Sequence, residues 1–167
     1  MRIPEDLRIV VHPLSLTERG AARAARRGEI IHLALALLSA PPPQGDLERS
    51  VLEAMALMGE DPKRWDLEEE FLRPLERLFL LPEMKRWFQG DGHPELEVMD
   101  GEGRLQRVDR VVIEGEKVDV IEYKVGHREA WHRAQVRGYV KLLKGLFPSK
   151  VIKGWLVYVD EGKIVEA

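Results

Sequence analysis

Two short segments, residues 107–113 and 118–124, are rich in β-branched residues and are separated by a turn. This pattern is typical of a β-hairpin, and the glycine between the segments suits a two-residue loop. That loop length places Asp109 opposite Glu122. Because strand side chains alternate between the two faces of a sheet, Lys124 shares the face of Glu122. The pattern therefore predicts two carboxylates and an ammonium group on a face that is otherwise apolar.

Helical patterns dominate the N-terminal part of the chain. A capping-box pattern at residues 15–18 predicts that a helix starts there. We expect Gly28 to interrupt it before a second helical segment, residues 30–39, which carries His32. The triple proline at residues 41–43 ends this segment, because proline lacks a backbone donor. Further helices are predicted over residues 47–58 with Asp46 as N-cap, over 66–80 with a kink at Pro74, and over 82–89.

The C-terminal half of the chain predicts strands around one long helix. A turn at residues 90–92 and a strand over 94–99, which carries Glu95, precede the hairpin. A helix is predicted over residues 128–147, and residues 151–159 are apolar enough for a buried strand, followed by a last short strand. The apolar stripe expected on the helix consists of Trp131, Ala134, Gly138, Tyr139, Leu142 and Leu146, with Gln135 inside it.

These elements predict an α/β protein in which helices flank a small mixed sheet. The chain has 167 residues, enough for a substantial hydrophobic core. We expect an N-terminal helical region, residues 1–92, that contributes His32, and a core over residues 93–167. The two parts together form one domain.

The polar residues of the hairpin suggest metal binding and catalysis. Opposed carboxylates repel each other, so a sheet that carries them needs a counter-charge. Carboxylate oxygens are the ligands that Mg²⁺ and Mn²⁺ prefer, and a nearby ammonium can orient a metal-bound water or neutralise a phosphate. Asp109, Glu122 and Lys124 are therefore candidate catalytic residues. The alternative is a solvated salt-bridge cluster, which the apolar residues on the same face disfavour.

Three short motifs resemble those of a known enzyme family, and they occur along the chain in the order that the family has. An aspartate followed on the next strand by Glu-x-Lys resembles the motif of the PD-(D/E)XK nuclease superfamily. A Q-x-x-x-Y pair and an R-G-x-x-x-H segment resemble the RecB-type branch, most closely the C-terminal exonuclease domain of RecB/AddA-like, UvrD-related helicases. The matching positions are Arg27, Gly28 and His32, then Asp109, Glu122 and Lys124, then Gln135 and Tyr139.

The resemblance implies a PD-(D/E)XK fold and Mg²⁺- or Mn²⁺-dependent hydrolysis of DNA phosphodiester bonds. It also implies exonuclease action together with a helicase in DNA end processing or repair. The implied metal ligands are His32, Asp109, Glu122 and the backbone carbonyl of Tyr123. Lys124 is then expected to position the attacking water or the scissile phosphate.

Other residues have expected supporting roles. Gln135 and Tyr139 are expected to support the site or hold the DNA strand, although core packing is the competing interpretation of Tyr139. Glu95 matches a glutamate that the family carries before the hairpin. Its role stays open between an added ligand, a partner of a ligand and a solvent-facing residue.

Three other functions remain open. The chain could be a non-catalytic DNA-binding or docking module of a helicase–nuclease complex, which the intact Asp109, Glu122 and Lys124 set disfavours. It could be a structure-specific or restriction-type endonuclease, which the Q-x-x-x-Y pair and His32 disfavour. A helical interaction protein that uses its acidic middle segment, residues 46–102, would leave the carboxylate–lysine cluster unexplained.

The charge distribution favours a phosphodiester substrate more than the formal net charge of −3 does. Residues 128–153 contain many bases and a single acid, Glu129. Within this strip, Arg133, Arg137 and Lys141 are candidates to follow a DNA backbone, since clustered cations attract phosphates. An ordinary solvated helix face is the alternative.

The chain has no cysteine, which excludes disulfides, thiolate zinc sites and iron–sulfur clusters. The most apolar run is too short to span a bilayer, and no signal peptide is visible. We therefore expect a cytoplasmic protein without a membrane partner. No ATPase phosphate-binding loop occurs in the sequence, so a helicase motor would lie on another segment or on a partner.

Overall fold

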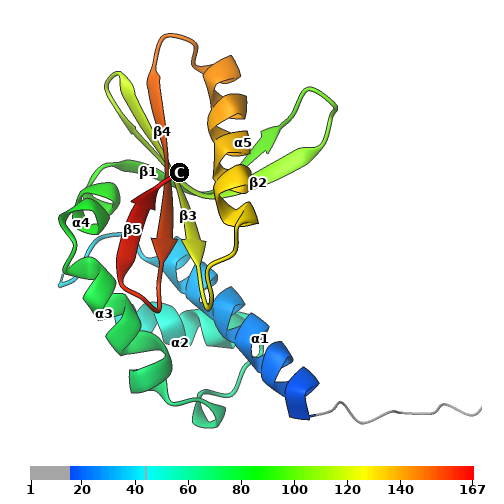
Figure 1. Ribbon diagram of the computed structural model, residues 1–167. Coiled ribbons are helices and arrows are strands. Elements are labelled where there is room, and N and C mark those ends of the chain that lie inside the picture. Colours follow the sequence, from blue (N-terminus) through cyan, green and yellow to red (C-terminus); the bar gives the residue numbers. More distant parts are fainter. Residues whose placement is uncertain (1–15, 44) are drawn as a thin grey trace, which may run out of the picture.

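The computed structural model describes residues 16–43 and 45–167, apart from the side chain of residue 16. The predicted capping box at residues 15–18 lies partly outside the described residues. Helices flank a mixed five-stranded sheet, which confirms the predicted α/β class (Figure 1). No helix in the described part of the chain is long and apolar enough to cross a membrane.

The sheet has the strand order β1-β2-β3-β4-β5. Neighbouring strands are antiparallel except β3 and β4, which are parallel and are joined through helix α5. The end of the β1–β2 hairpin projects beyond the rest of the sheet (Figure 1). The elements are β1 (Asp91–Met99), β2 (Leu105–Glu114), β3 (Lys117–Lys124), α5 (Trp131–Leu146), β4 (Val151–Tyr158) and β5 (Lys163–Glu166).

The predicted register of the β2–β3 hairpin is confirmed. Val111 pairs with Val120, and Glu114 pairs with Lys117 around the two-residue loop. The loop glycine, Gly115, has a φ of 57°, a conformation that residues with a Cβ rarely adopt. Local sequence therefore fixes which side chains of this hairpin share a face.

Strand β1 begins at Asp91, so the turn predicted at residues 90–92 is wrong. Gly92 is already paired with Val112 of β2. A Cβ at Gly92 would lie 2.5 Å from Nη1 of Arg110, a buried side chain. The glycine is thus required by a close approach inside the sheet, and it does not mark a chain reversal.

The N-terminal region forms α1 and a series of shorter helices. Helix α1 is continuous through Gly28, so the expected interruption there is wrong. One glycine costs a helix only about 1 kcal/mol, and burial of Ile30, Ile31 and Leu35 outweighs this cost. The described helices here are α1 (Leu16–Leu37), α2 (Leu47–Leu57), a 3₁₀ turn (Pro62–Arg64), a π-helical turn (Glu68–Leu72), α3 (Arg73–Phe79) and α4 (Pro82–Gln89).

Two helix starts follow their sequence signals. The Asp46 side chain accepts a hydrogen bond from the backbone N–H of Arg49, as expected of the N-cap of α2. The irregularity expected at Pro74 takes the form of a π-helical turn that leads directly into α3. Pro74 then lies in the first turn of α3, where its missing N–H has no intrahelical partner to lose.

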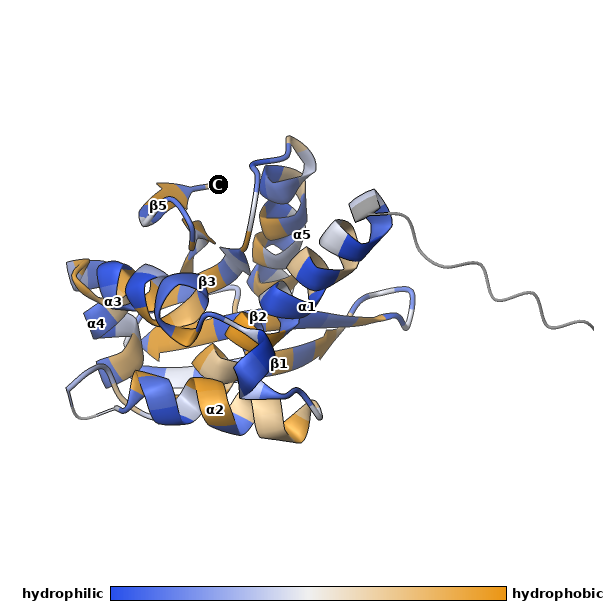
Figure 2. Cartoon of the chain, turned by 90° about the horizontal axis from the view of Figure 1, so that it is seen from below, coloured by the Kyte–Doolittle hydropathy of each residue, from blue (hydrophilic) through white to orange (hydrophobic). Residues whose placement is uncertain are grey.

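Helices cover both faces of the sheet. On one face, α1 to α4 bury a core that includes Phe71, Trp87 and Tyr123. On the other face, α5 packs Tyr139 and Leu143 against valines of β2 and β3. Figure 2 shows α2 and α5 banded in hydrophobic and hydrophilic colours, as expected of helices that each turn one side to a core.

The predicted apolar stripe of α5 is partly wrong. The buried side chains are His132, Val136, Tyr139 and Leu143, whereas Trp131 is 52% exposed. Ala134, Gly138 and Leu146, which the stripe also included, are exposed as well. The helix is therefore rotated relative to the prediction, because its valine side chains pack over a glycine of β4.

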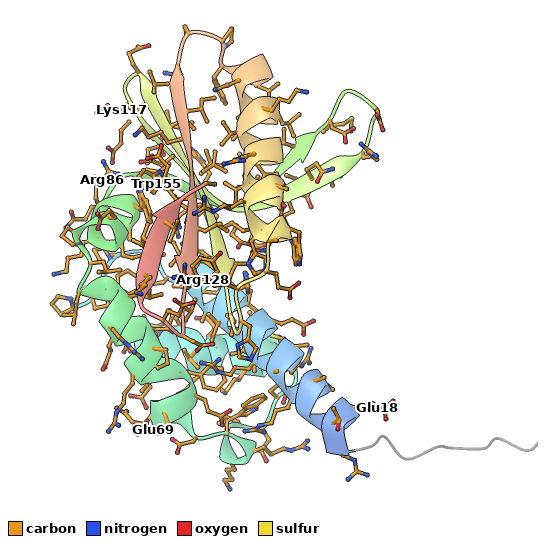
Figure 3. The ribbon with its side chains drawn as sticks, viewed as in Figure 1. Glu18, Glu69, Arg86, Lys117, Arg128 and Trp155 are labelled. Atoms are coloured by element: carbon orange, nitrogen blue, oxygen red, sulfur yellow. The ribbon has the colours of Figure 1, made fainter. Side chains whose placement is uncertain are left out.

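A buried carboxylate ties α4 to the sheet. Asp119 accepts hydrogen bonds from the indole N–H groups of Trp87 at 3.0 Å and Trp155 at 2.7 Å. Arg86 adds an ion pair at 3.0 Å, and Figure 3 shows Arg86 and Trp155 close together on one side of the molecule. Both carboxylate oxygens are thus satisfied, which makes Asp119 a structural residue.

Candidate active site

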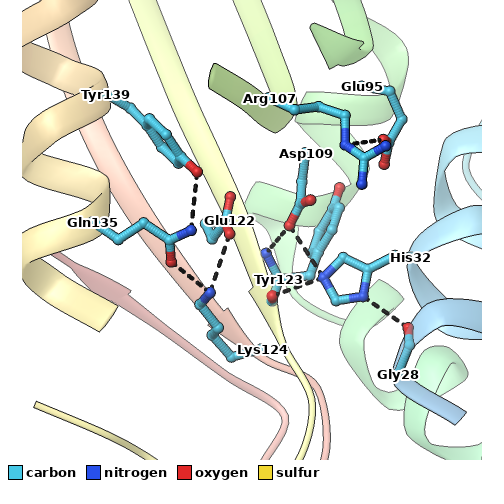
Figure 4. A network of polar contacts seen from close by, with 10 residues as sticks. All are labelled: Gly28, His32, Glu95, Arg107, Asp109, Glu122, Tyr123, Lys124, Gln135 and Tyr139. Carbon is cyan, nitrogen blue, oxygen red and sulfur yellow. Dashed lines mark hydrogen bonds and ion pairs between the residues drawn. The ribbon is translucent and has the colours of Figure 1, made fainter. Parts of the chain in front are cut away.

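Eight of the predicted site residues line one cleft with a volume of about 1060 Å³. The cleft lies among α1, the first three strands and the N-terminal half of α5 (Figure 4). It brings together residues that are far apart in the sequence. The predicted residues that line it are His32, Glu95, Asp109, Glu122, Tyr123, Lys124, Gln135 and Tyr139.

Asp109 lies where β2 and β3 begin to separate. The last paired residues before it are Arg110 and Ile121. Oδ2 of Asp109 accepts a hydrogen bond from the backbone N–H of Tyr123 at 2.8 Å. The carboxylate thus takes the place of the next ladder bond, which fixes the side chain at the mouth of the hairpin.

His32 reaches this point from α1. Its Nε2 lies 3.0 Å from the carbonyl oxygen of Tyr123 and 3.2 Å from Oδ2 of Asp109, and its Nδ1 lies 2.7 Å from the carbonyl oxygen of Gly28. Burial lowers the pKa of His32, but the hydrogen bond and charge of Asp109 outweigh burial and raise that pKa to about 9. The protonated ring can then donate from both nitrogens. In the neutral ring, an Nδ1–H donated to Gly28 would leave the Nε2 lone pair free.

Glu122 is a buried carboxylate, with 5% of the residue exposed. Its Oε1 accepts a hydrogen bond from Nζ of Lys124 at 3.1 Å, whereas its Oε2 is buried and has no partner among the described residues. Burial and repulsion by Asp109 raise the pKa of Glu122 to about 7, although Lys124 lowers it. A buried acceptor without a donor costs free energy, so this oxygen is poised for a positively charged or protonated partner.

Lys124 connects the strand to α5. Besides Glu122, its Nζ donates to Oε1 of Gln135 at 2.7 Å. Nε2 of Gln135 in turn donates to the hydroxyl of Tyr139 at 2.9 Å, and burial raises the pKa of Tyr139. The chain of contacts from Glu122 to Tyr139 is drawn in Figure 4. Gln135, a partly buried amide, is thus held by contacts on both of its polar atoms.

Glu95 lies beside Asp109 in the sheet. In the β1–β2 register it falls between the pairs Pro94–Arg110 and Leu96–Val108, and its φ is 52°. Its Oε2 forms an ion pair with Nε of Arg107 at 2.9 Å, and burial raises the pKa of Glu95. Glu95 therefore faces the cleft with its carboxylate held by an arginine.

The basic residues of α5 lie outside the cleft. Arg133, Arg137 and Lys141 are exposed, and none of them forms an ion pair with another described residue. Arg137 and Lys141 line a separate depression of about 390 Å³, together with Lys144 and Lys153. The structure thus places the predicted basic strip outside the cleft and leaves its charge open to solvent.

Arg107 and Trp131 line the cleft but had no functional role in the sequence-based prediction. Arg107 lies two residues before Asp109 on the same strand face, so strand alternation offered a signal for it. Trp131 was predicted as part of a buried stripe, yet it lies exposed in the cleft with Nζ of Lys124 4.9 Å from its ring centre. No local signal distinguished it, because its exposure depends on the rotation of α5.

The cleft contains groups that can bind a divalent cation. In the described part of the chain, no three His, Asp or Glu side chains are already gathered as a metal cluster. The donors nevertheless fit such an ion: an imidazole nitrogen, a carboxylate and a backbone carbonyl meet at His32, and the nearby Glu122 has an unsatisfied oxygen. Oxygen-rich sets of this kind suit Mg²⁺ and Mn²⁺.

The fold and the cleft together define an α/β protein whose sheet carries an acidic site with a partly buried lysine beside it. The family model described as the PD-(D/E)XK nuclease superfamily matches residues 7–166, nearly the whole chain. The chain therefore belongs to the PD-(D/E)XK nuclease superfamily.

Other comparisons add little. No match is found among curated proteins. A solved structure titled "Crystal structure of SSO0001" is 18% identical, with a TM-score of 0.35, and the match covers 84% of this chain and 64% of that chain. The chain thus spans a little under two thirds of that protein's length.

Proposed function

We propose that this protein is a metal-dependent deoxyribonuclease that hydrolyses DNA phosphodiester bonds, and that it acts as an exonuclease with a UvrD-like helicase. The observation that carries the proposal is the buried carboxylate of Glu122. One of its oxygens is bonded to Lys124, and the other lacks a described partner in a cleft that also holds Asp109 and His32. Membership of a nuclease superfamily supports it.

The proposed metal-binding groups are the side chains of His32, Asp109 and Glu122 and the carbonyl oxygen of Tyr123. A bound Mg²⁺ or Mn²⁺ ion supplies a coordinated water of lowered pKa and stabilises charge on the leaving oxygen. Gly28 accepts from the far nitrogen of His32 and thereby orients the ring toward the other ligands.

Lys124 is the proposed electrostatic catalyst. Its ammonium is held between Glu122 and Gln135, so it is pre-oriented before DNA arrives. It can donate a hydrogen bond to a non-bridging oxygen of the scissile phosphate or to the attacking water. Gln135 and Tyr139 hold Lys124 in this position through their shared hydrogen bond.

The exposed bases of α5 are the proposed track for the DNA backbone. Arg133, Arg137 and Lys141 have no acidic partner among the described residues, so their charge is available to phosphates. Binding that depends on such contacts weakens steeply as the salt concentration rises. In this proposal Arg107, at the opposite rim, adds a further cation beside Glu95.

Exonuclease action and a helicase partner rest on the resemblance of the motifs around His32 and Gln135 to the RecB-type branch. No ATPase phosphate-binding loop occurs in the sequence, so the motor would be supplied by another segment or subunit. These finer features are therefore tested separately from cleavage itself.

The test is cleavage of end-labelled linear single-stranded and duplex DNA in Mg²⁺ or Mn²⁺. We expect metal-dependent loss of label, with no cleavage by Glu122→Ala. Equal cleavage by both proteins would indicate a contaminant and contradict the proposal. Cleavage of closed circular DNA would identify an endonuclease, whereas calorimetry without Mn²⁺ binding would favour a docking module.

Lys124→Ala tests the role of the lysine. Loss of a pre-oriented electrostatic group lowers kcat about 10²–10³-fold. The control is Lys117→Ala, which removes a lysine from the other end of the same strand. We expect full activity in the control, and circular dichroism should show that both variants fold. Full activity of Lys124→Ala would refute the assigned role.

A further inference from the structure

Trp131 is an exposed aromatic residue inside the cleft. It is the first residue of α5, and 52% of it is exposed to solvent. The two tyrosines that line the same cleft, Tyr123 and Tyr139, are buried. Among the described Trp, Tyr and Phe residues of the cleft, Trp131 therefore offers by far the most accessible ring.

The indole is held in place although it is exposed. Its N–H donates a hydrogen bond to the carboxylate of Glu129. Its ring meets the His132 ring edge-to-face, with a centroid distance of 4.6 Å and an interplanar angle of 78°. A fixed aromatic ring loses little conformational entropy when a ligand packs on it, so these contacts prepare Trp131 for binding.

The indole also adjoins the proposed catalytic group. Nζ of Lys124 lies 4.9 Å from the Trp131 ring centre. The same Nζ is already fixed by Glu122 at 3.1 Å and Gln135 at 2.7 Å, so it does not need the indole to hold it. Because Nζ lies over one face of the ring, a base would stack on the other face, with its phosphate near Lys124.

We propose that Trp131 is a stacking platform for an unpaired nucleobase next to the scissile phosphate, and that the substrate of this site is single-stranded DNA or an unpaired DNA end. The inference rests on the proposed nuclease function and adds its substrate class. Every base has a π-face, so stacking on tryptophan requires no particular sequence. Inside a duplex both faces of a base are covered by its neighbours, so a base must be unstacked to reach the indole.

The test measures DNA binding by fluorescence anisotropy, with Ca²⁺ in place of Mg²⁺ so that no turnover occurs. The probe is a fluorescein-labelled oligodeoxynucleotide, either single-stranded or in a blunt duplex. We expect Trp131→Ala to weaken single-strand binding about tenfold and blunt-duplex binding less than about twofold. Trp131→Phe keeps a π-face and should restore most of the affinity. Leu146→Ala removes an exposed apolar side chain from the other end of α5 and should change neither affinity.

Three outcomes would overturn the inference. They are unchanged single-strand affinity in Trp131→Ala, equal losses on both substrates, or a fall in kcat on both substrates without any change in affinity. The last would mean that Trp131 acts through Lys124. Binding is measured without turnover, so it is independent of cleavage. If the native protein cleaves DNA but Trp131→Ala keeps the same preference for single-stranded over duplex DNA, this inference alone is refuted. Failure of the native protein to bind or cut either DNA removes the proposed function as well.

Discussion

Arg27 and Asp160, 133 residues apart in the sequence, form a bidentate ion pair with N–O distances of 2.7 and 3.1 Å. The same aspartate accepts the backbone N–H of Gly126 at 2.8 Å, two residues beyond Lys124. Arg27 also donates to the carbonyl oxygen of Glu70 at 2.8 Å. The pair thus fixes α1, which carries His32, against the segment that follows β3.

Asp160→Asn should lower the free energy of unfolding by about 1–2 kcal/mol at pH 7, because a charge-assisted, partly exposed pair is lost. Burial raises the pKa of Asp160, but the bonds from Arg27 and Gly126 outweigh burial and hold it below the ordinary value of 3.8. A carboxyl with a lowered folded-state pKa contributes stability above pH 3.8, and this contribution is lost as the pH falls below that value. Urea unfolding of both proteins at pH 7 and pH 3 measures the effect.

The control for this pair is Arg73→Ala, which removes exposed ion pairs with Glu68 and Glu69. Its effect should stay below about 0.5 kcal/mol, as is usual for surface pairs. Equal losses in Arg73→Ala and Asp160→Asn would show that the position of Asp160 has no special importance.

Glu122→Gln should make the metal-free protein more stable while abolishing cleavage. The pKa of Glu122, about 7 in the fold, lies above the ordinary 4.5, so ionisation of the buried carboxylate opposes folding. This penalty grows as the pH rises from 4.5 to about 7 and then stays constant. We therefore expect a gain of roughly 1–3 kcal/mol at pH 8 with EDTA and none near pH 4.

Thermal and urea unfolding with and without Mn²⁺ complete this prediction. Mn²⁺ should stabilise the native protein by mass action and leave Glu122→Gln unaffected. Glu116→Gln, an exposed glutamate of the same hairpin, is the matched control and should behave as the native protein does. Loss of stability in Glu122→Gln at pH 8 would show that the carboxylate is favourable without metal.

Gln135→Ala should lower the cleavage rate about 10–100-fold with little change in DNA affinity, as is typical when a group that orients a catalytic residue is removed. The amide is the link between Lys124 and Tyr139. Tyr139→Phe leaves the contact between Gln135 and Lys124 intact and should therefore have a smaller effect. Single-turnover rates at saturating enzyme measure both, and a larger loss in Tyr139→Phe would contradict the assigned order.

Gly154→Ala should destabilise the protein by roughly 1–3 kcal/mol and also slow cleavage. A Cβ at this position of β4 would lie 2.4 Å from Val136 and 2.8 Å from Val140, so α5 would have to move away from the sheet. Gly138→Ala is the control, since its Cβ meets nothing within 4 Å. It should stabilise α5 by up to about 1 kcal/mol, through higher helix propensity.

The hairpin shows how much local pattern can predict. The register of β2 and β3 followed from the loop length and the alternation of side chains, and the cap at Asp46 followed from an aspartate directly before a helical pattern. The strand faces of Glu122 and Lys124 were fixed in the same way. Each of these features depends on residues close together in the chain, where geometry leaves few choices.

The errors concern features that depend on distant contacts. The patterns around Gly28 and Gly92 do not reveal that the first lies within a packed helix and the second beside a buried arginine. The rotation of α5, which exposes Trp131, is decided by the contact of Val136 with Gly154. A helix whose apolar residues permit two stripes takes its orientation from the surface on which it packs.

By itself the sequence determined the order of the elements, the superfamily motifs and the side of each strand on which the polar residues lie. Only the tertiary structure decided that His32 meets Asp109 and that Glu122 keeps one oxygen without a described partner. It also decided that the Trp131 side chain lies exposed in the cleft. The reason is that strand alternation and helix periodicity act over a few residues, whereas burial and electrostatics depend on which segments the folded core brings together.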